Sequence, residues 1–416
     1  MNFYMKRRFL FLCRKTCFMI VFAVILSTNI VNAETLNFEQ IKQKIFNHNS
    51  DLSATNNTIK ATQKEIQQAG AIPNPELEIG TENFGENEIE VVLTQPIELG
   101  GKRKARIKIA HKELLMAELE QKAKVIELET KITRQCVTIL GLQKKIAILD
   151  SLSSVMEESL KYIKRRINAG AIIEADVLRS EMEMDELLLE KSKLKRQLKQ
   201  QTNVLTSLWG NTDNTDLYIS CKLNPSITMP SQQEILKKLN EHPEIKVLKL
   251  NMETIDAEIN LLKAEAFPEM ALSLGYLRNN EEKEDIVLAG ISISLPLFDR
   301  NKKAILSKSY EIMSAGDKCQ AFIVERKTEI ATILSEIKQI NSSLLVLTEK
   351  LKPKANKVYA LLERYYKNGS IRISEVLEGR KNLLEINQRL IDLNMEKALL
   401  AADLAQLSGI NINIIQ

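Results

Sequence analysis

Residues 165–178 read Arg-Arg-Ile-Asn-Ala-Gly-Ala-Ile-Ile-Glu-Ala-Asp-Val-Leu, and residues 364–377 read Arg-Tyr-Tyr-Lys-Asn-Gly-Ser-Ile-Arg-Ile-Ser-Glu-Val-Leu. In each stretch a long helical pattern ends at a glycine, Gly170 or Gly369. A glycine can adopt the positive φ that such a turn needs. An acidic residue then opens a second long helical pattern. Both stretches are therefore predicted to be tips of helical hairpins.

Further landmarks repeat at nearly the same separation along the chain. A period of about 195 to 200 residues is far longer than a solenoid unit. The sequence therefore indicates a duplicated half-molecule. The landmarks are Pro96 with Pro296, Gly210 with Gly409 and, at a slightly shorter offset, Pro73 with Pro268.

The first 33 residues have the pattern of a secretory signal peptide. Five basic residues precede and flank the apolar run 18–26, and Val31-Asn32-Ala33 supplies a small residue at the cut. The alternative is a membrane anchor, but the run has about ten residues where a spanning helix needs ~20. Cys13 and Cys17 lie upstream of the run, so neither resembles a lipidation site.

Removing residues 1–33 takes away five positive charges and no acidic residue, so the formal charge falls from +4 to about −1. A nucleic-acid partner is not expected, because such proteins keep a basic excess. Cys136, Cys221 and Cys319 allow at most one disulfide and form no framework. Few glycines, prolines and aromatic residues, with 27% charged residues, favour long helices and coiled coils.

In the first repeat, residues 34–210, a helix is predicted over 35–70. Two segments with period-two alternation follow and predict a β-hairpin over 76–95. A helix of about 67 residues, roughly 100 Å at ~1.5 Å per residue, then fills 102–168. A return helix occupies 175–208, so the first tip lies near residue 170.

Residues 211–230 read as an irregular equatorial join, and the second repeat, 231–416, has the same order. A helix over 231–265 precedes a strand pair over 270–295. Asp299 is expected to cap a long helix that reaches 368, with a kink at Pro353. The last helix fills 373–408, so the second tip lies near residue 369.

The predicted fold is mainly α, a long coiled-coil barrel wall with a small membrane β part. Four strands cannot close a barrel, and open edges are a liability in an exported chain. Three copies would supply twelve strands, which is enough for closure. A homotrimer with a 12-stranded β-barrel is therefore expected.

This layout resembles the TolC-like outer-membrane efflux channels. Residues 72–77 (Ile-Pro-Asn-Pro-Glu-Leu) and 95–103 (Gln-Pro-Ile-Glu-Leu-Gly-Gly-Lys-Arg) carry the likeness, together with the duplicated order. The chain is most similar to the outer-membrane components of cobalt-zinc-cadmium resistance systems. The resemblance covers essentially the whole mature chain.

The resemblance implies a passive, non-enzymatic conduit in the outer membrane, with its helical barrel in the periplasm. It also implies three kinds of protein partner: two further copies of the chain, a periplasmic adaptor, and an inner-membrane resistance-nodulation-division pump. Three departures are visible. No lipid-attachment cysteine follows the signal, the corner 295–300 lacks the double glycine, and the chain stops soon after the last helix.

Glu375 and Glu378 lie three residues apart at the start of the last helix, so they share one face. In the family, acidic residues at these positions form the narrowest ring of the lumen. Six carboxylates in a trimer would repel anions and attract cations. The alternative is that Ser374 caps the helix and the glutamates complement its positive end.

Asp176 and Tyr366 match family positions that bond between neighbouring coils and hold the tip closed. The alternative for Asp176 is an ordinary first-turn acid. The family's arginine partner falls on Ile371, with Arg372 next to it, which departs from the full latch. The turns at Gly170 and Gly369 are the expected adaptor-docking sites.

The first hairpin carries acidic residues mostly opposite its apolar ones. In a membrane barrel the apolar set must face lipid, which turns the carboxylates into the lumen. The alternative is the solvated face of a soluble hairpin. The expected lumen acids are Glu76, Glu78, Glu82, Glu88 and Glu90.

No catalytic set, metal-ligand spacing, cofactor motif or phosphate loop is present in the sequence. His242-Pro243-Glu244 favours helix capping over metal binding. The predicted function is export of heavy-metal cations. The alternatives are multidrug efflux or type I protein secretion through the same kind of channel and, from another class, a soluble periplasmic coiled-coil adaptor or scaffold.

Overall fold

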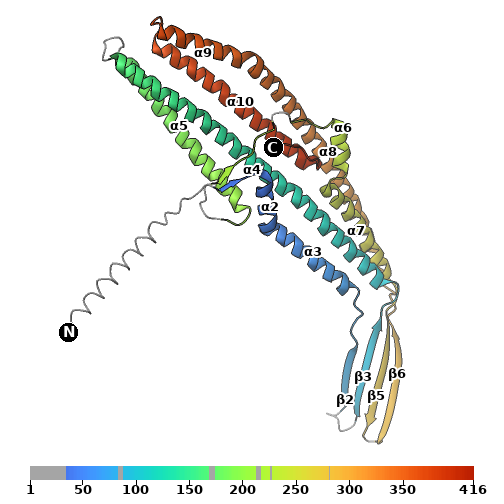
Figure 1. The fold of residues 1–416 in the computed structure, drawn as a ribbon. Helices are drawn as coiled ribbons and strands as arrows, with labels where there is room; N and C mark the ends of the chain where they lie inside the picture. Colours follow the sequence, from blue (N-terminus) through green and yellow to red (C-terminus); the bar gives the residue numbers. More distant parts are fainter. Residues whose placement is uncertain (1–33, 83–87, 168–173, 212–216, 225–226, 281) are drawn as a thin grey trace, which may run out of the picture.

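The computed structural model describes residues 34–82, 88–167, 174–211, 217–224, 227–280 and 282–416. The predicted signal peptide, residues 1–33, and the first tip glycine, Gly170, lie outside these ranges. The described chain is a long bundle of helices with a four-stranded sheet at one end and the helix tips at the other (Figure 1).

The same order of elements occurs twice. The first half runs β1 (Glu34–Leu36), α2 (Phe38–His48), α3 (Ser50–Ala69), β2 (Glu76–Glu82), β3 (Glu88–Ile97), α4 (Lys102–Ile167) and α5 (Glu174–Ser207). The second runs β4 (Leu217–Ile219), α6 (Gln232–Asn240), α7 (Pro243–Glu265), β5 (Met270–Asn279), β6 (Glu284–Ile293), α8 (Lys302–Leu345), η2 (Val346–Leu351), α9 (Lys352–Lys367) and α10 (Ile373–Ser408). Each half is therefore a short helix, a longer helix, two strands and a long helical hairpin.

The first helical stretch is broken where a single helix over 35–70 was expected. Asn49 ends α2 and caps α3, because its side chain accepts a hydrogen bond from the amide of Leu52 at 3.1 Å. Its Nδ2 also donates to the carbonyl of Leu208 at 2.8 Å, which ties the break to the end of α5. The single helix predicted over 35–70 is therefore wrong, because Asn49 ends one helix and caps the next.

The second half has the corresponding break at His242. Its Nδ1 accepts a hydrogen bond from the amide of Glu244 at 3.3 Å, and Pro243 opens α7. The capping role predicted for His242 is confirmed. Burial lowers the pKa of this imidazole, so the neutral, accepting form is favoured.

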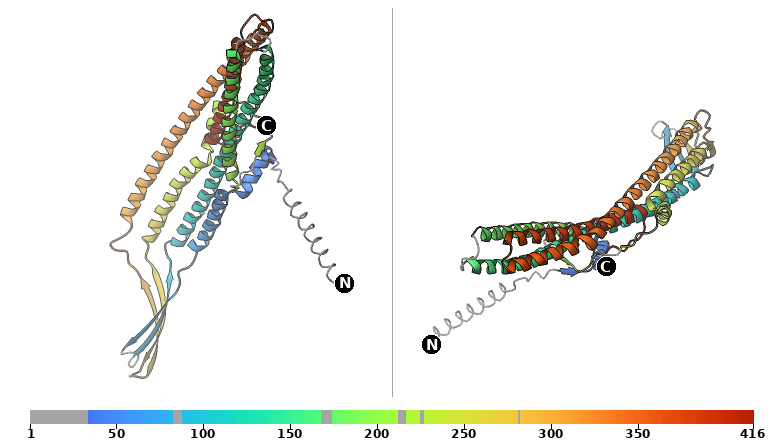
Figure 2. Two further views of the ribbon diagram at one scale, coloured as in Figure 1. Left: turned by 90° about the vertical axis from the view of Figure 1, so that its left-hand side faces the viewer. Right: turned by 90° about the horizontal axis from the view of Figure 1, so that it is seen from above.

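The strands form one antiparallel sheet in the order β2-β3-β5-β6. The central pair, β3 with β5, joins the two halves, with Leu93 opposite Leu274. Strands β2 and β6 lie at the two edges, and within the described chain neither has a second neighbour. The sheet extends from one end of the helices, as the left view of Figure 2 shows.

The main hydrophobic core lies at mid-length, where α2, α4, α10 and the short strands meet. Ile132 on α4 and Leu404 on α10 are fully buried in it. Beside it β1 pairs in parallel with β4, and the amide of Lys222 donates to the carbonyl of Gln416. The equatorial join therefore uses both chain ends of the described region, where residues 211–230 were expected to supply most of it.

Two close contacts shape the long helices. At Gly141 a Cβ would lie 1.8 Å from the Sδ of Met395, so α4 and α10 approach here over a glycine. Before Pro353 the helix takes six residues of π-helical geometry, Val346–Leu351. A proline has no amide hydrogen and its ring crowds the preceding turn, which the wider turn accommodates.

Candidate functional site

The register of the sheet places the acidic residues of the first hairpin on one face. Glu78 lies opposite Val92, Gly80 opposite Glu90, and Glu82 opposite Glu88. Directly opposite residues point to the same side of an antiparallel pair, and side chains alternate along each strand. The side chains of Glu76, Glu78, Glu88 and Glu90 therefore share one face of the sheet. The side chain of Glu82, the fifth predicted lumen acid, lies outside the described part of the chain.

The other face of the same strands is apolar. Leu77 pairs with Leu93 and Ile79 with Val91, and these leucines and Ile79 are exposed in the single chain. In β5 the residues Leu272 and Leu274 continue this face. An exposed apolar face backed by a carboxylate face is the pattern of a membrane barrel wall, not of a soluble hairpin.

The second hairpin contributes less charge to the carboxylate face. On that face the described residues of β5 and β6 include one acid, Glu284, together with small residues and three apolar ones, Leu277, Ile286 and Leu288. At the far end of the apolar face, Asp285 accepts hydrogen bonds from the hydroxyl of Tyr276 and from Arg278, both at 2.6 Å. The carboxylates of the sheet are thus concentrated on β2 and β3.

At the second tip, Gly369 forms the turn that the sequence predicted. Its φ is +73°, and its amide donates to the carbonyl of Tyr366 at 2.9 Å. The next amide, Ser370, donates to the carbonyl of Tyr365 at 2.9 Å. These two bonds complete a Schellman motif, which satisfies the last carbonyls of α9. A Cβ on Gly369 would meet open space, so only its backbone angle calls for glycine.

Glu375 and Glu378 lie in the first two turns of α10 and are both exposed. Val376 and Leu377 point the other way, into a small core cluster at the tip. The helix begins at Ile373 with Arg372 at the cap position and no side-chain cap bond. The alternative in which Ser374 caps the helix is therefore wrong, because Ser374 already lies inside it.

Asp176 lies in the first turn of α5 and is half-buried. Its neighbour Val177 belongs to the tip cluster against which Tyr366 and Ile371 pack. The structure therefore brings the start of α5, the end of α9 and the start of α10 together at one level. Arg372, beside the family's arginine position, is exposed.

Arg380 is a tip residue that the sequence reading did not identify. It is 5% exposed, and its guanidinium donates to the hydroxyl of Tyr359 at 3.2 Å, to the Sδ of Met156 at 2.8 Å and to the Oγ of Ser159 at 3.4 Å. These contacts tie α10 to both α9 and α4. The available signal was a charged residue in register with the buried positions Ile373 and Leu377.

A buried carboxylate faces this guanidinium. Burial raises the pKa of Glu183 on α5, and the nearby positive charge of Arg380 opposes that rise. Both residues line a groove of about 210 Å³ between α5 and α10, with Leu149 on its floor. The two tip hairpins therefore meet at a groove that holds both charges beside apolar packing.

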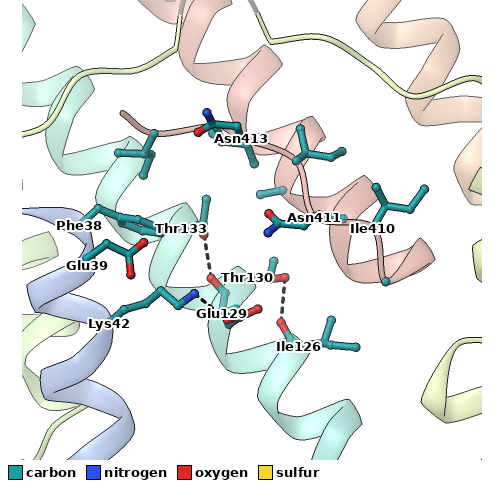
Figure 3. Close-up of a pocket in the computed structure, with 16 residues that line it drawn as sticks. Phe38, Glu39, Lys42, Ile126, Glu129, Thr130, Thr133, Ile410, Asn411 and Asn413 are labelled. Carbon is teal, nitrogen blue, oxygen red and sulfur yellow. Dashed lines mark hydrogen bonds and ion pairs between the residues drawn. The ribbon is translucent and has the colours of Figure 1, made fainter.

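A larger cavity, of about 590 Å³, lies at the equator between α2, α4 and the C-terminal residues (Figure 3). Lys42 pairs with Glu129 across it at 2.8 Å. Thr130 and Thr133 donate to carbonyls of their own helix, as the dashed lines in Figure 3 show. Lys42, Glu129 and the two threonines bond to one another or to their own helix, so these groups do not indicate a ligand.

Among the described residues no group of three or more histidine, cysteine, aspartate and glutamate side chains could hold a metal ion. The described thiols of Cys136, Cys221 and Cys319 are free, and burial raises the pKa of Cys136. The candidate sites are therefore the charged surfaces of the sheet and the tip.

Residues 42–211 and 235–410 match the family described as outer membrane efflux protein. The chain belongs to this family. The two matched segments correspond to the two halves of the repeat. This efflux protein is thus a component of the outer membrane, and the alternative of a soluble periplasmic scaffold is wrong.

Among curated proteins, the efflux protein is 23% identical to the cobalt-zinc-cadmium resistance protein CzcC of Cupriavidus metallidurans, over 82% of each chain. It is 21% identical to the nickel and cobalt resistance protein CnrC of the same organism, over 67% of this chain and 68% of that one. Among solved structures it is similar to CusC, with a TM-score of 0.76, 16% identity and coverage of 90% and 92%. It is also similar to the open state of MtrE from Neisseria gonorrhoeae, with a TM-score of 0.71, 14% identity and coverage of 89% and 88%.

Proposed function

We propose that the efflux protein is a homotrimeric channel that exports heavy-metal cations passively from the periplasm to the exterior. It would be the outer-membrane part of a tripartite system, together with a resistance-nodulation-division pump and a periplasmic adaptor. The observation that carries the proposal is the sheet register, which puts four glutamates on one face of the first hairpin and most of its apolar residues on the other. No covalent chemistry is needed for such a conduit.

Assembly follows from the edges of the sheet. Strands β2 and β6 each have one paired side, and all ten residues of β6 are exposed. Unpaired strand groups cannot remain in hydrocarbon, so each β6 must pair with the β2 of a neighbour. Three copies close twelve strands around a lumen.

The long helices also carry apolar surface that a single copy leaves open. The stretch 302–367 is long and apolar enough to cross a membrane by length and composition, with 22% of its most apolar window buried. It packs along α7 and α10, beside the sheet axis, and its exposed Leu306, Tyr310 and Met313 recur at helical spacing. Packing between copies explains this surface better than a membrane span.

The charge of the closed channel favours cations. Four glutamates per copy on the lumen face of the first hairpin give twelve carboxylates in three copies, and rings of acidic side chains attract cations and repel anions. At the other end, Glu375 and Glu378 would add a second ring of six. No tight metal site is required, because a conduit works best when ions leave easily.

The tips are the proposed docking and gating region. They lie at the end farthest from the sheet (Figure 1), so an adaptor from the inner membrane would meet the turns at Gly170 and Gly369. Asp176 and Tyr366 would bond between neighbouring copies when the tip is closed. Arg380 would hold the two hairpins of one copy together while such bonds change.

Growth under metal stress tests the cargo. A deletion strain should lose resistance to zinc, cadmium, cobalt or nickel, and the wild-type gene should restore it. The variant Glu88→Gln, Glu90→Gln should restore less, while a matched pair of exposed glutamates on α8, Glu325→Gln, Glu336→Gln, should restore it fully. Sensitivity to antibiotics alone, or a secretion defect alone, would assign the channel to multidrug efflux or type I secretion instead.

A further inference from the structure

The starts of the two long helices carry a concentrated basic charge beside the membrane strands. Between residues 98 and 108 there are five basic residues and one acidic residue, and between 294 and 308 there are four and one. Both helices begin at the end of the sheet that meets the helical bundle, α4 after β3 and α8 after β6 (Figure 1). The basic residues of the two halves therefore lie at the same edge of the membrane-spanning sheet.

Some of these basic residues form ion pairs within the chain. Arg106 donates to both carboxylate oxygens of Glu98, and Lys102 bonds Glu269 at 2.9 Å. Four further basic side chains at these helix starts are exposed, and within the described part of the chain no acidic group pairs with them. They are Arg103, Lys104, Lys302 and Lys303.

Helix stability does not account for the four residues. The first turn of a helix carries a partial positive charge, so cations are disfavoured there and acids are favoured. Neither α4 nor α8 has an acidic residue in its first turn. The cations are thus placed where they weaken their own helices, which points to a stabilising partner outside the chain.

Apolar side chains surround the same corners. Leu295 and Leu297 are about two-thirds exposed, and Phe298 is wholly exposed. Phe267, at the end of α7, is also exposed. Aromatic and aliphatic side chains at the ends of membrane strands, followed by lysine and arginine, are typical of a membrane interface. There the apolar groups enter the acyl region and the cations reach the headgroups.

We propose that Arg103, Lys104, Lys302 and Lys303 form a basic collar that binds anionic phospholipid headgroups of the periplasmic leaflet of the outer membrane. The occupant follows from charge complementarity and from the direct continuity of the collar with the lipid-facing strands. The collar holds the barrel at a fixed depth, and the exposed Phe298 and Leu297 pack on the acyl chains. The inference rests on insertion of the sheet into a bilayer, which belongs to the proposed function, and does not depend on the exported cargo.

Lipid capture by the purified trimer tests the collar. The detergent-solubilised wild type is mixed with equal amounts of phosphatidylglycerol and phosphatidylethanolamine, recovered, and its bound lipids are quantified by mass spectrometry. Each exposed basic residue near an anionic surface contributes a several-fold gain, so we expect the glycerol lipid to be enriched about tenfold or more. High salt should abolish the enrichment. Inorganic phosphate at matched ionic strength should leave it intact, which distinguishes a lipid site from a phosphate site.

Two matched variants decide the assignment. Changing all four collar residues to glutamine should bring the enrichment to about one, whereas Lys195→Gln, Arg196→Gln, Lys199→Gln, Lys237→Gln should keep it. If the collar variant does not assemble, the milder pair Lys302→Gln, Lys303→Gln should lower the enrichment several-fold. Equal loss in both sets, or no enrichment in the wild type, would overturn the proposal. A wild type that never enters the membrane fraction would instead refute the channel itself.

Discussion

The two strand-to-helix corners solve one geometric problem with different residues. In the first corner Gly100 has a φ of +73°, and a Cβ there would lie 2.7 Å from the Cβ of Phe267 and 2.8 Å from the carbonyl of Ala264. In the second corner Asn301 takes the left-handed conformation, with a φ of +57°. Its Nδ2 donates to the carbonyl of Leu262 at 3.0 Å.

Both corners therefore turn through a left-handed residue that lies against the end of α7. The first corner touches α7 through bare backbone and must have glycine. In the second corner the backbone lies far enough from α7 to leave room for a side chain. Asn301 fills this room, because asparagine tolerates the left-handed conformation and its side chain can bond to α7. The second half lacks the double glycine but still forms the corner. A hydrogen bond from Asn301 to α7 takes the place of the close backbone contact that Gly100 makes in the first half.

The largest expected effect comes from closing the space at the first corner. Gly100→Val adds a strained backbone and a clash with Phe267, so we expect a loss of at least about 3 kcal/mol and little inserted trimer. Gly101→Val is the matched control, because Gly101 also has positive φ but open space around it. Membrane fractionation and trimer melting measure both. Equal losses for the two variants would show that the contact with α7 is irrelevant.

A smaller effect is expected at the second corner. Asn301→Ala removes the hydrogen bond to α7 and leaves a β-carbon in the left-handed region, which together cost about 1–2 kcal/mol. Asn301→Gly relieves the backbone strain and should lose less. Thermal melting of the trimer measures the difference. If glycine is no better than alanine, the left-handed conformation does not limit this corner.

At the second tip Gly369 also has a positive φ, but a side chain there would meet open space. Gly369→Val places a β-branched residue at positive φ in open space, so a local cost of about 1–2 kcal/mol is expected without loss of insertion. Metal resistance should fall because the turn that we propose as the adaptor-docking site is distorted. Gly369→Asn, which tolerates this conformation, is the control and should retain resistance. Full resistance with valine would remove the tip from the docking site.

The smallest expected effect is a pH dependence confined to the first corner. The hydrogen bonds from Arg106 lower the pKa of Glu98 below its ordinary 4.5. A carboxyl group with a lowered folded-state pKa stabilises the fold above its unfolded-state pKa, and this contribution is lost as the pH falls through the folded-state pKa. Glu98→Gln should therefore melt below the wild type at pH 7, and the gap should narrow below about pH 4.5. A gap that stays constant down to pH 3 would contradict the ion pair's role.

Much of this architecture follows from patterns along the chain. Period-two alternation locates β2 and β3 and separates Glu88 and Glu90 from Ile89 and Val91, because strand side chains alternate strictly. Long apolar stripes without proline predict α4. The duplicated glycine turns give the hairpin order. These signals are local, and the structure contains the predicted strands, the long helix and the turn at Gly369. The predicted turn at Gly170 lies outside the described residues.

Features that depend on contacts between distant segments could not be predicted in this way. The break at Asn49 is held in part by Leu208, and the left-handed Asn301 is held by Leu262. The sequence around Arg380 is that of an ordinary surface arginine. Its burial depends on Tyr359 and Met156, which lie on other helices. The pairing of β1 with β4 joins two three-residue segments that are too short to show a period.

The central claim is that the two carboxylate surfaces make a cation-selective pore, and the reversal potential of single trimers in a planar bilayer under a salt gradient tests it most directly. The wild type should prefer cations, and Glu375→Gln, Glu378→Gln should reduce that preference and weaken block by multivalent cations, with little change in trimer stability. A wild-type trimer that is anion-selective, or an intact double variant with unchanged selectivity and unchanged block, would contradict the account.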